Sequence, residues 1–220
     1  MKLENIAKRI SLARESKVKH IMPYDNFYDR LSSVADLLDF VEDKKADRKI
    51  RHEARKYFVV ACASSIEIYF KRMAQVFINA GWINEEFREI LRRDNISLAD
   101  LLDIKKKDLS LGEIISVSHS LQDLDSVNHF FSKMLGVNDF LKEIETVKIV
   151  PEDGKKYTLK SEYPDFRGKI GELLNLRHLI IHHEGFKRIL GHRRLLRMGL
   201  CVLALVSAAD NYLIGKIPED

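Results

Sequence analysis

The sequence of 220 residues predicts an all-α fold, a helical bundle with two long core helices. It contains only ten glycines and four prolines, and so few turn-forming residues favour long helices over a protein of many short strands. Apolar residues recur every three or four positions along most of the chain, which is the period of one helix face. With 45% hydrophobic and 32% charged residues, the chain is apolar enough to form a globular core.

The clearest helix is predicted from about Ile50 to Ala80, and Gly81 is placed to cap its C-terminus. Its apolar face contains Phe58, Cys62, Ile66, Tyr69, Met73 and Phe77. The last predicted helix, at about 186–213, is the second long one. The other helices are expected at about 2–20, 26–45, 84–93, 97–106, 111–121, 124–135, 138–146 and 165–184, with Ser97 and Asp100 resembling an N-cap pair.

Residues 147–163 interrupt the helical period. Pro151, Asp153 and Gly154 predict a turn, and the flanking stretches VKIV and YTL are the one candidate for a small β-hairpin, near residues 147–160. The whole chain is expected to form a single domain, 1–220, with residues 1–46 as a helical extension packed on it.

Several classes of protein are excluded by composition. Cys62 and Cys201 each lie in an apolar run, which argues against a disulfide framework and a cysteine-based zinc site. The N-terminal residues lack the apolar stretch of a signal peptide. The longest apolar run, Leu195–Val206, is interrupted by Arg197 and is shorter than the roughly 20 residues that span a bilayer. We therefore expect a cytoplasmic protein with no membrane contact.

Three of the eight histidines, His178, His182 and His183, fall in the segment ELLNLRHLIIHHEGF. His182 and His183 would lie in the last turn of a helix ended by Gly185, where the helix dipole favours an imidazolium, and a histidine there suits acid–base chemistry. A pair of exposed histidines that only complement the dipole is the alternative.

Arg177 falls inside the apolar stripe of the same helix, which is formed by Phe166, Ile170, Leu173, Leu174, Ile180 and Ile181. A guanidinium there needs a partner or a polar cavity, so it is either a structural pair or a ligand-binding group. Glu67 lies on a second apolar face of the 50–80 helix. It is either the partner of Arg177 or an exposed i,i+4 pair with Lys71.

Arg177 and His182 differ by about 140° around a straight helix. They converge only if the helix ends or bends near His182, or if two chains meet there around a two-fold axis.

These residues resemble a known family. RHLIIHHEG is similar to the R-x4–6-H signature of HEPN domains, with Arg177 and His182 at the paired positions and His178 where the family usually has Asn. ACASSIEIYFKRMAQ resembles the preceding core helix, with Glu67 at the acid of its S-x-E-x-Y/F pattern. The stretch Leu111–Gly136 looks like the middle of the RiboL-PSP-HEPN-like branch. The resemblance covers about Ile50–Leu213.

The resemblance implies a dimeric, metal-independent endoribonuclease that needs no cofactor and leaves 2′,3′-cyclic phosphate products, as in many toxins and phage-defence proteins. It implies that Arg177 and His182 are catalytic, with His178, His183, Glu67 and Asn175 in support. An antitoxin or defence-system protein is a further expected partner. Glu184 stands where one subgroup has an AMPylated tyrosine, which disfavours that arrangement. A non-catalytic HEPN-like module that binds RNA or protein, and a structural adaptor, are the alternatives.

The positive charge is concentrated near these residues. Between Lys160 and Leu200 there are nine Lys or Arg against four Asp or Glu, whereas the rest of the chain has 28 against 29. This distribution predicts RNA binding, with a steep dependence on salt, by Lys187, Arg188, Arg193 and Arg194 beside the histidines. A solvated helix face is the alternative interpretation.

Overall fold

The computed structural model describes residues 23–44, 46–93, 110–150, 154–183 and 186–217. Within these residues the protein is built from helices and contains no strands. The helices are α2 (Pro23–Asp43), α3 (Arg48–Ala80), α4 (Glu85–Arg93), α6 (Leu111–Ser118), α7 (Leu124–Leu135), α8 (Phe140–Ile144), α9 (Leu159–Glu162), α10 (Phe166–His182) and α11 (His192–Ile214). The predicted all-α fold is confirmed.

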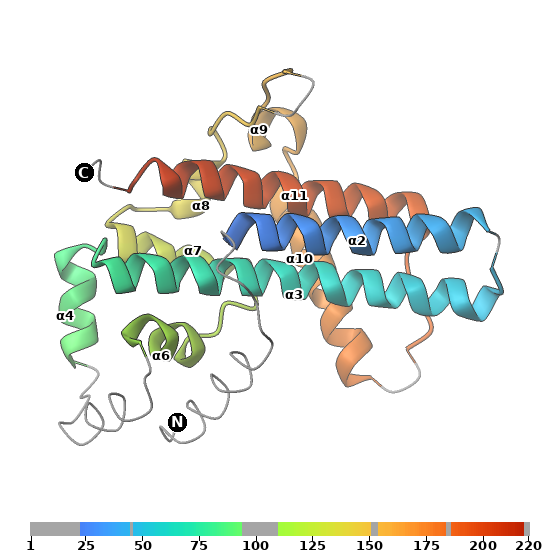
Figure 1. Ribbon diagram of the computed structural model, residues 1–220, viewed down its shortest axis with the longest axis horizontal. Coiled ribbons are helices and arrows are strands. Elements are labelled where there is room, and N and C mark those ends of the chain that lie inside the picture. The colour runs from blue at the N-terminus through green and yellow to red at the C-terminus, as the bar shows by residue number, and fades with distance from the viewer. Residues whose placement is uncertain (1–22, 45, 94–109, 151–153, 184–185, 218–220) are drawn as a thin grey trace.

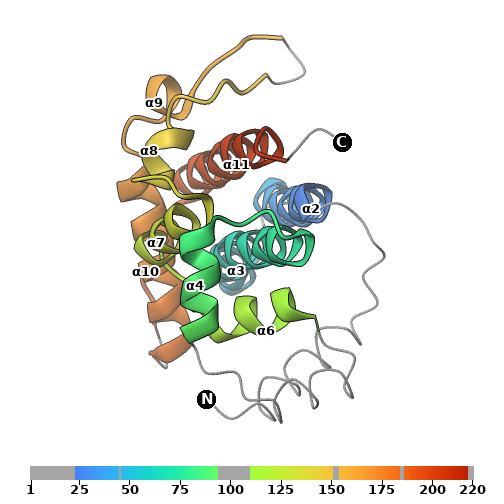
Figure 2. The ribbon, with the colours of Figure 1, turned by 90° about the vertical axis from the view of Figure 1, so that its left-hand side faces the viewer.

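The central helix of the bundle is α3. It contacts α2, α6, α10 and α11, and in the end-on view these helices surround it (Figure 2). The helices α2, α3 and α11 run side by side along the longest axis of the molecule, and α10 crosses them (Figure 1). All six residues of the predicted α3 face are at most 4% exposed. Asp47 caps the start of α3 by accepting from the Lys49 amide, and Gly81 ends it at φ 75°, a left-handed conformation that suits glycine.

The second long core helix is α11. It is long and apolar enough to cross a membrane by length and composition, but 67% of its most apolar stretch is buried inside the bundle. It therefore packs as the core helix that the sequence predicts, and Cys62 and Cys201 are both buried and unpaired.

One buried and one half-buried hydrogen bond connect the three long helices. The Tyr69 hydroxyl on α3 donates to Asp210 Oδ1 on α11 at 2.9 Å, and the hydroxyls of Tyr24 on α2 and Ser207 on α11 lie 2.9 Å apart. Burial raises the pKa of Asp210 above its ordinary value, against the opposing effect of the Tyr69 hydrogen bond. The Tyr69 hydroxyl therefore compensates a carboxyl group that is only 9% exposed.

Some predicted boundaries were wrong. The last helix begins at His192 and not at Phe186, because Ile189 and Leu190 pack against the core from a non-helical segment and Gly191 is extended at the N-cap. The expected hairpin is reduced to one antiparallel bridge between Ile149 and Tyr157. Thr158 turns the chain into the unpredicted α9 through a capping box with Ser161.

Other helices are shorter than predicted. The helix expected at 138–146 covers only Phe140–Ile144, because Asp139 caps it by accepting from the Lys142 amide. The helix expected at 111–121 ends at Ser118. The helices expected at 2–20 and 97–106, with the Ser97–Asp100 cap, lie outside the described residues.

Removal of the Tyr69 hydroxyl tests the buried hydrogen bond. We expect Tyr69→Phe to lower the free energy of unfolding by about 1–3 kcal/mol, because it leaves the Asp210 carboxyl without its donor. Urea denaturation followed by circular dichroism at pH 7 measures the loss. Tyr57→Phe is the control, since Tyr57 lies on the same helix and is 53% exposed. Equal stability of the two variants would contradict the role given to Tyr69.

Candidate functional site

The C-terminal half of α10 carries the candidate site. At its start, Phe166, Ile170 and Leu173 are buried and fix the helix against the core. The predicted apolar stripe weakens towards the C-terminus, where Ile181 is 48% exposed, contrary to its assignment to the buried face. Arg177 lies at this transition, and its side chain is 23% exposed. The guanidinium is thus half-buried at the edge of the core.

Glu67 on α3 makes both of the contacts that the sequence allowed as alternatives. Its Oε1 accepts from Lys71 Nζ at 2.6 Å, and its Oε2 lies 3.9 Å from Arg177 Nη2. The second distance is an ion pair but is too long for a hydrogen bond. Arg177 is therefore attracted to Glu67 without using its donors on it.

Arg177 also has a donor that no protein group satisfies. Its Nε is buried and has no hydrogen-bond partner among the described residues. Most buried polar groups are paired, and an exception is typical of a site kept for a ligand, water or ion. Arg177 therefore has hydrogen-bonding capacity that its contact with Glu67 leaves unused.

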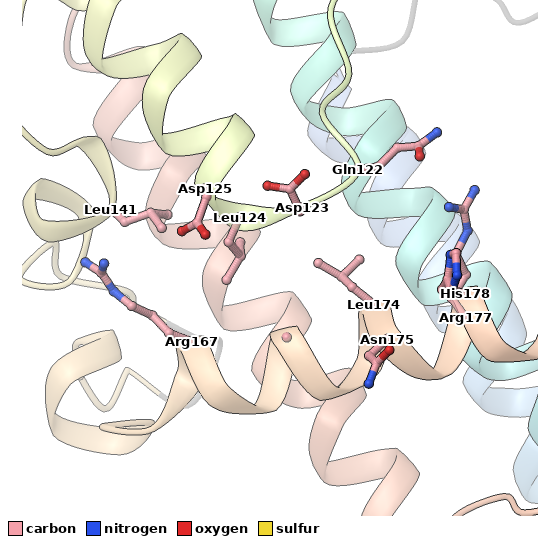
Figure 3. Close-up of a pocket in the computed structure, with 11 residues that line it drawn as sticks. Gln122, Asp123, Leu124, Asp125, Leu141, Arg167, Leu174, Asn175, Arg177 and His178 are labelled. Carbon is pink, nitrogen blue, oxygen red and sulfur yellow. The ribbon is translucent and has the colours of Figure 1, made fainter.

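Beside Arg177 lies an open hollow of about 410 Å³. Gln122, Arg177 and His178 lie at one end of it and Asp125 and Arg167 at the other (Figure 3). Arg167 is occupied, because its guanidinium contacts Glu145 at 2.9 Å and Asp139 at 3.7 Å. The available positive charge of the hollow is therefore at the Arg177 end.

The predicted supporting residues lie in two places. His178 and Asn175 line the hollow together with Arg177. His182 and His183 are exposed and are not among its lining residues. The ring centroid of His178 lies 4.6 Å from that of His182 and 6.5 Å from that of His183. His178 thus connects the hollow to the two exposed histidines.

The helix remains regular through His182, which is its last residue, and His183 is extended. The helix end therefore comes too late to turn His182 towards Arg177, and the two side chains stay about 140° apart around the axis of one chain. The sequence allowed Arg177 and His182 to converge either at the helix end or across a two-fold axis between two chains. Within one chain, the helix end does not bring them together.

The four predicted RNA-binding residues are exposed and lie on the segment 186–191 and the first turn of α11. Arg194 is engaged by Glu172, whose carboxylate oxygens lie 2.7 and 2.9 Å from its Nη2. Lys187, Arg188 and Arg193 make no ion pair within the described part of the chain. Among the described residues, no group of three or more His, Cys, Asp or Glu side chains is placed to hold a metal ion.

Sequence reasoning missed the residues near the start of α7 that line the hollow. Gln122, Asp123 and Asp125 lie just before or at the start of α7, some 50 positions before Arg177, and no local pattern connects them to it. Only the packing of α7 on α10 brings these polar groups to the candidate site.

The all-helical bundle is consistent with the HEPN class that the sequence resembles. The family model RiboL-PSP-HEPN matches residues 25–215, and the chain belongs to this family. The match begins within α2 and so extends further than the similarity over about Ile50–Leu213. No curated protein and no solved structure gives a significant match. Membership indicates a nuclease or an RNA-binding module. The division into a domain and an extension at residue 46 stays a prediction.

The role of Glu67 is tested by neutralising it. We expect Glu67→Gln to lower the free energy of unfolding by about 1–3 kcal/mol, because it leaves the half-buried charges of Lys71 and Arg177 uncompensated. Glu53→Gln is the matched control. Glu53 pairs with Lys56 on the same helix but is 58% exposed, and the expected change is within about 0.5 kcal/mol. Denaturant unfolding measures the loss of unfolding free energy in both variants. Equal losses would contradict the structural role given to Glu67.

Proposed function

We propose that this protein is a metal-independent endoribonuclease of HEPN type that cuts single-stranded RNA, acting in the cytoplasm as a toxin or phage-defence nuclease. The observation that carries the proposal is the Arg177 guanidinium, which is held 3.9 Å from Glu67 with its donors free, in the same helical segment as the His178–His182 contact. A cation with free donors beside imidazole groups suits the cleavage of a phosphodiester.

The reaction uses the nucleophile of the RNA itself. His182 removes the proton of the 2′-hydroxyl, and the oxygen attacks the adjacent phosphorus. The P–O5′ bond breaks as the new P–O2′ bond forms, and an imidazolium returns a proton to the leaving 5′-oxygen. The products are a 2′,3′-cyclic phosphate and a 5′-hydroxyl. General acid–base catalysis of this kind contributes about 10²- to 10⁴-fold.

Arg177 contributes electrostatically. Its guanidinium binds the non-bridging oxygens and stabilises the charge that develops on the phosphorane. Glu67 keeps the side chain in place without neutralising its donors. His178 takes the position of the usual Asn, and in this chain it lines the hollow and contacts the His182 ring. We propose that it orients His182 against the bound phosphate.

A homodimer completes the site in this scheme. Because Arg177 and His182 point to different sides of α10, each catalytic centre combines Arg177 of one protomer with His182 of the other. A toxin of this type is expected to be held in check by an antitoxin or defence-system protein.

The second candidate is a non-catalytic module that binds RNA or protein. Two observations favour it: His178 replaces the usual Asn, and His182 lies outside the hollow that Arg177 lines. It differs from the nuclease in a single measurable respect, because it binds without cutting.

Cleavage in EDTA tests the proposed activity. We expect the purified protein to cut a single-stranded RNA in excess EDTA, which removes catalytic metals. His182→Ala or Arg177→Ala should lower the rate by about 10²- to 10⁴-fold. His129→Ala is the control, since His129 is an exposed histidine on α7. Binding without cleavage by the wild type would favour the non-catalytic module, and full activity of both site variants would refute the assignment.

Mixing two inactive variants tests the shared site. Arg177→Ala and His182→Ala protomers, unfolded and refolded together, should regain roughly a quarter of the wild-type activity, because half of the dimers are mixed and each restores one of two centres. If both residues act within one protomer, no mixed dimer contains an intact centre. Activity that stays at the level of the single variants would therefore contradict the composite site.

A further inference from the structure

A second hollow, of about 650 Å³, lies at the start of α3. Five of its lining residues are Lys or Arg and one is His: Arg48, Lys49, Arg51, His52, Arg55 and Lys187. We call this set the α3 basic hollow. It combines the first turns of α3 with the segment 186–191, which leads from the end of α10 to the start of α11 beside α3 (Figure 1). Residues far apart in sequence thus bring like charges together.

Few acids neutralise this hollow. Asp47 lines it but serves as the N-cap of α3, accepting from the Lys49 amide at 2.7 Å. Glu42 on α2 lies 2.7 Å from Arg55 Nε and 3.8 Å from Arg51 Nη1, and the bond from Arg55 lowers the pKa of this carboxyl. Arg48, Lys49 and Lys187 make no ion pair with the residues that the structure describes. The hollow therefore keeps a clear excess of positive charge.

The placement of these charges is costly for the helix. The N-terminal end of a helix carries positive partial charge, so cations in the first turn are unfavourable there. The first turn of α3 contains no acid. In addition, Arg51 Nε is buried and has no hydrogen-bond partner among the described residues. Helix stability does not account for this arrangement, whereas a bound anion would compensate it.

The hollow lies close to the proposed catalytic segment. Lys187 is four residues after His183, and four residues of chain span at most about 14 Å. The hollow beside Arg177 is mixed in charge, because Asp123, Asp125, Arg167 and Arg177 all line it. A polyanion bound at the histidines therefore meets the larger excess of positive charge on the Lys187 side.

We propose that the α3 basic hollow is a second phosphate-binding subsite, which holds the backbone of a single-stranded RNA several nucleotides away from the scissile phosphate. This inference rests on the proposed nuclease function for its choice of ligand. It assigns RNA-binding roles to Arg48, Lys49 and Arg51. Together with Lys187, these residues define a path for the RNA from the histidine cluster towards α3.

The test compares two double variants that each remove two positive charges. Arg48→Gln/Lys49→Gln alters the hollow. Lys142→Gln/Lys216→Gln is the matched control, because both lysines are exposed, on α8 and just after α11, and neither lines the hollow. Fluorescence anisotropy with a labelled single-stranded 20-mer of roughly the length that spans several subsites measures affinity over a salt series.

We expect the Arg48/Lys49 variant to bind about 10- to 30-fold more weakly at 0.1 M salt, with the slope of log K against log salt reduced by about 1.4, since each lost phosphate contact removes about 0.7. The control variant should match the wild type. The melting temperature of the Arg48/Lys49 variant should equal or exceed that of the wild type, because the change removes cations from a helix N-terminus.

Cleavage of a dinucleotide, which is too short to reach both subsites, should be the same for the wild type and the Arg48/Lys49 variant. Unchanged RNA affinity and salt slope in that variant would overturn the subsite. Weaker binding of a poly-glutamate peptide together with unchanged RNA binding would assign the hollow to an acidic protein and also overturn it. If the wild type binds RNA but never cuts it, the nuclease proposal fails while the binding comparison still decides the subsite.

Discussion

The Glu67 carboxylate is the contact on which the candidate site depends. It lies on the central helix between Lys71 and Arg177, and so it connects α3 to the end of α10. Charges at the edge of a core are tolerated only when they are paired. The Lys71 contact, at 2.6 Å, is a hydrogen bond, whereas the Arg177 contact, at 3.9 Å, is not. One acid thus compensates two cations and leaves the donors of the second available.

Positive and negative charges are unevenly distributed around the Glu67–Arg177 contact. Acids from the start of α7 line one side of Arg177, whereas cations from α3 and the segment 186–191 lie beyond the histidines. The α10 helix joins the two regions, and the His178 ring lies between Arg177 and the exposed histidines. We propose that a bound phosphate chain lies on the side with the larger excess of positive charge.

Much of the fold follows from the sequence, because helical periodicity is a local property. The α3 face and its Gly81 cap, and the whole of α7, were predicted with accurate bounds. The start of α11 was not, since the extended course of Ile189 and Leu190 depends on packing against the core. The site was predicted in part. Its α10 residues form a local pattern, but the contributions of Asp125 and Arg48 arise only when distant helices meet.

We propose that Arg177 and His182 cut RNA through its own 2′-hydroxyl. Mass spectrometry of the ends of RNA fragments produced in EDTA tests it most directly. We expect 2′,3′-cyclic phosphate and 5′-hydroxyl ends with the wild-type protein, and their formation to be slower by about 10²- to 10⁴-fold with Arg177→Ala. Fragments with 5′-phosphate ends, or cyclic phosphate ends that form as fast with the Arg177 variant as with the wild type, would contradict this mechanism.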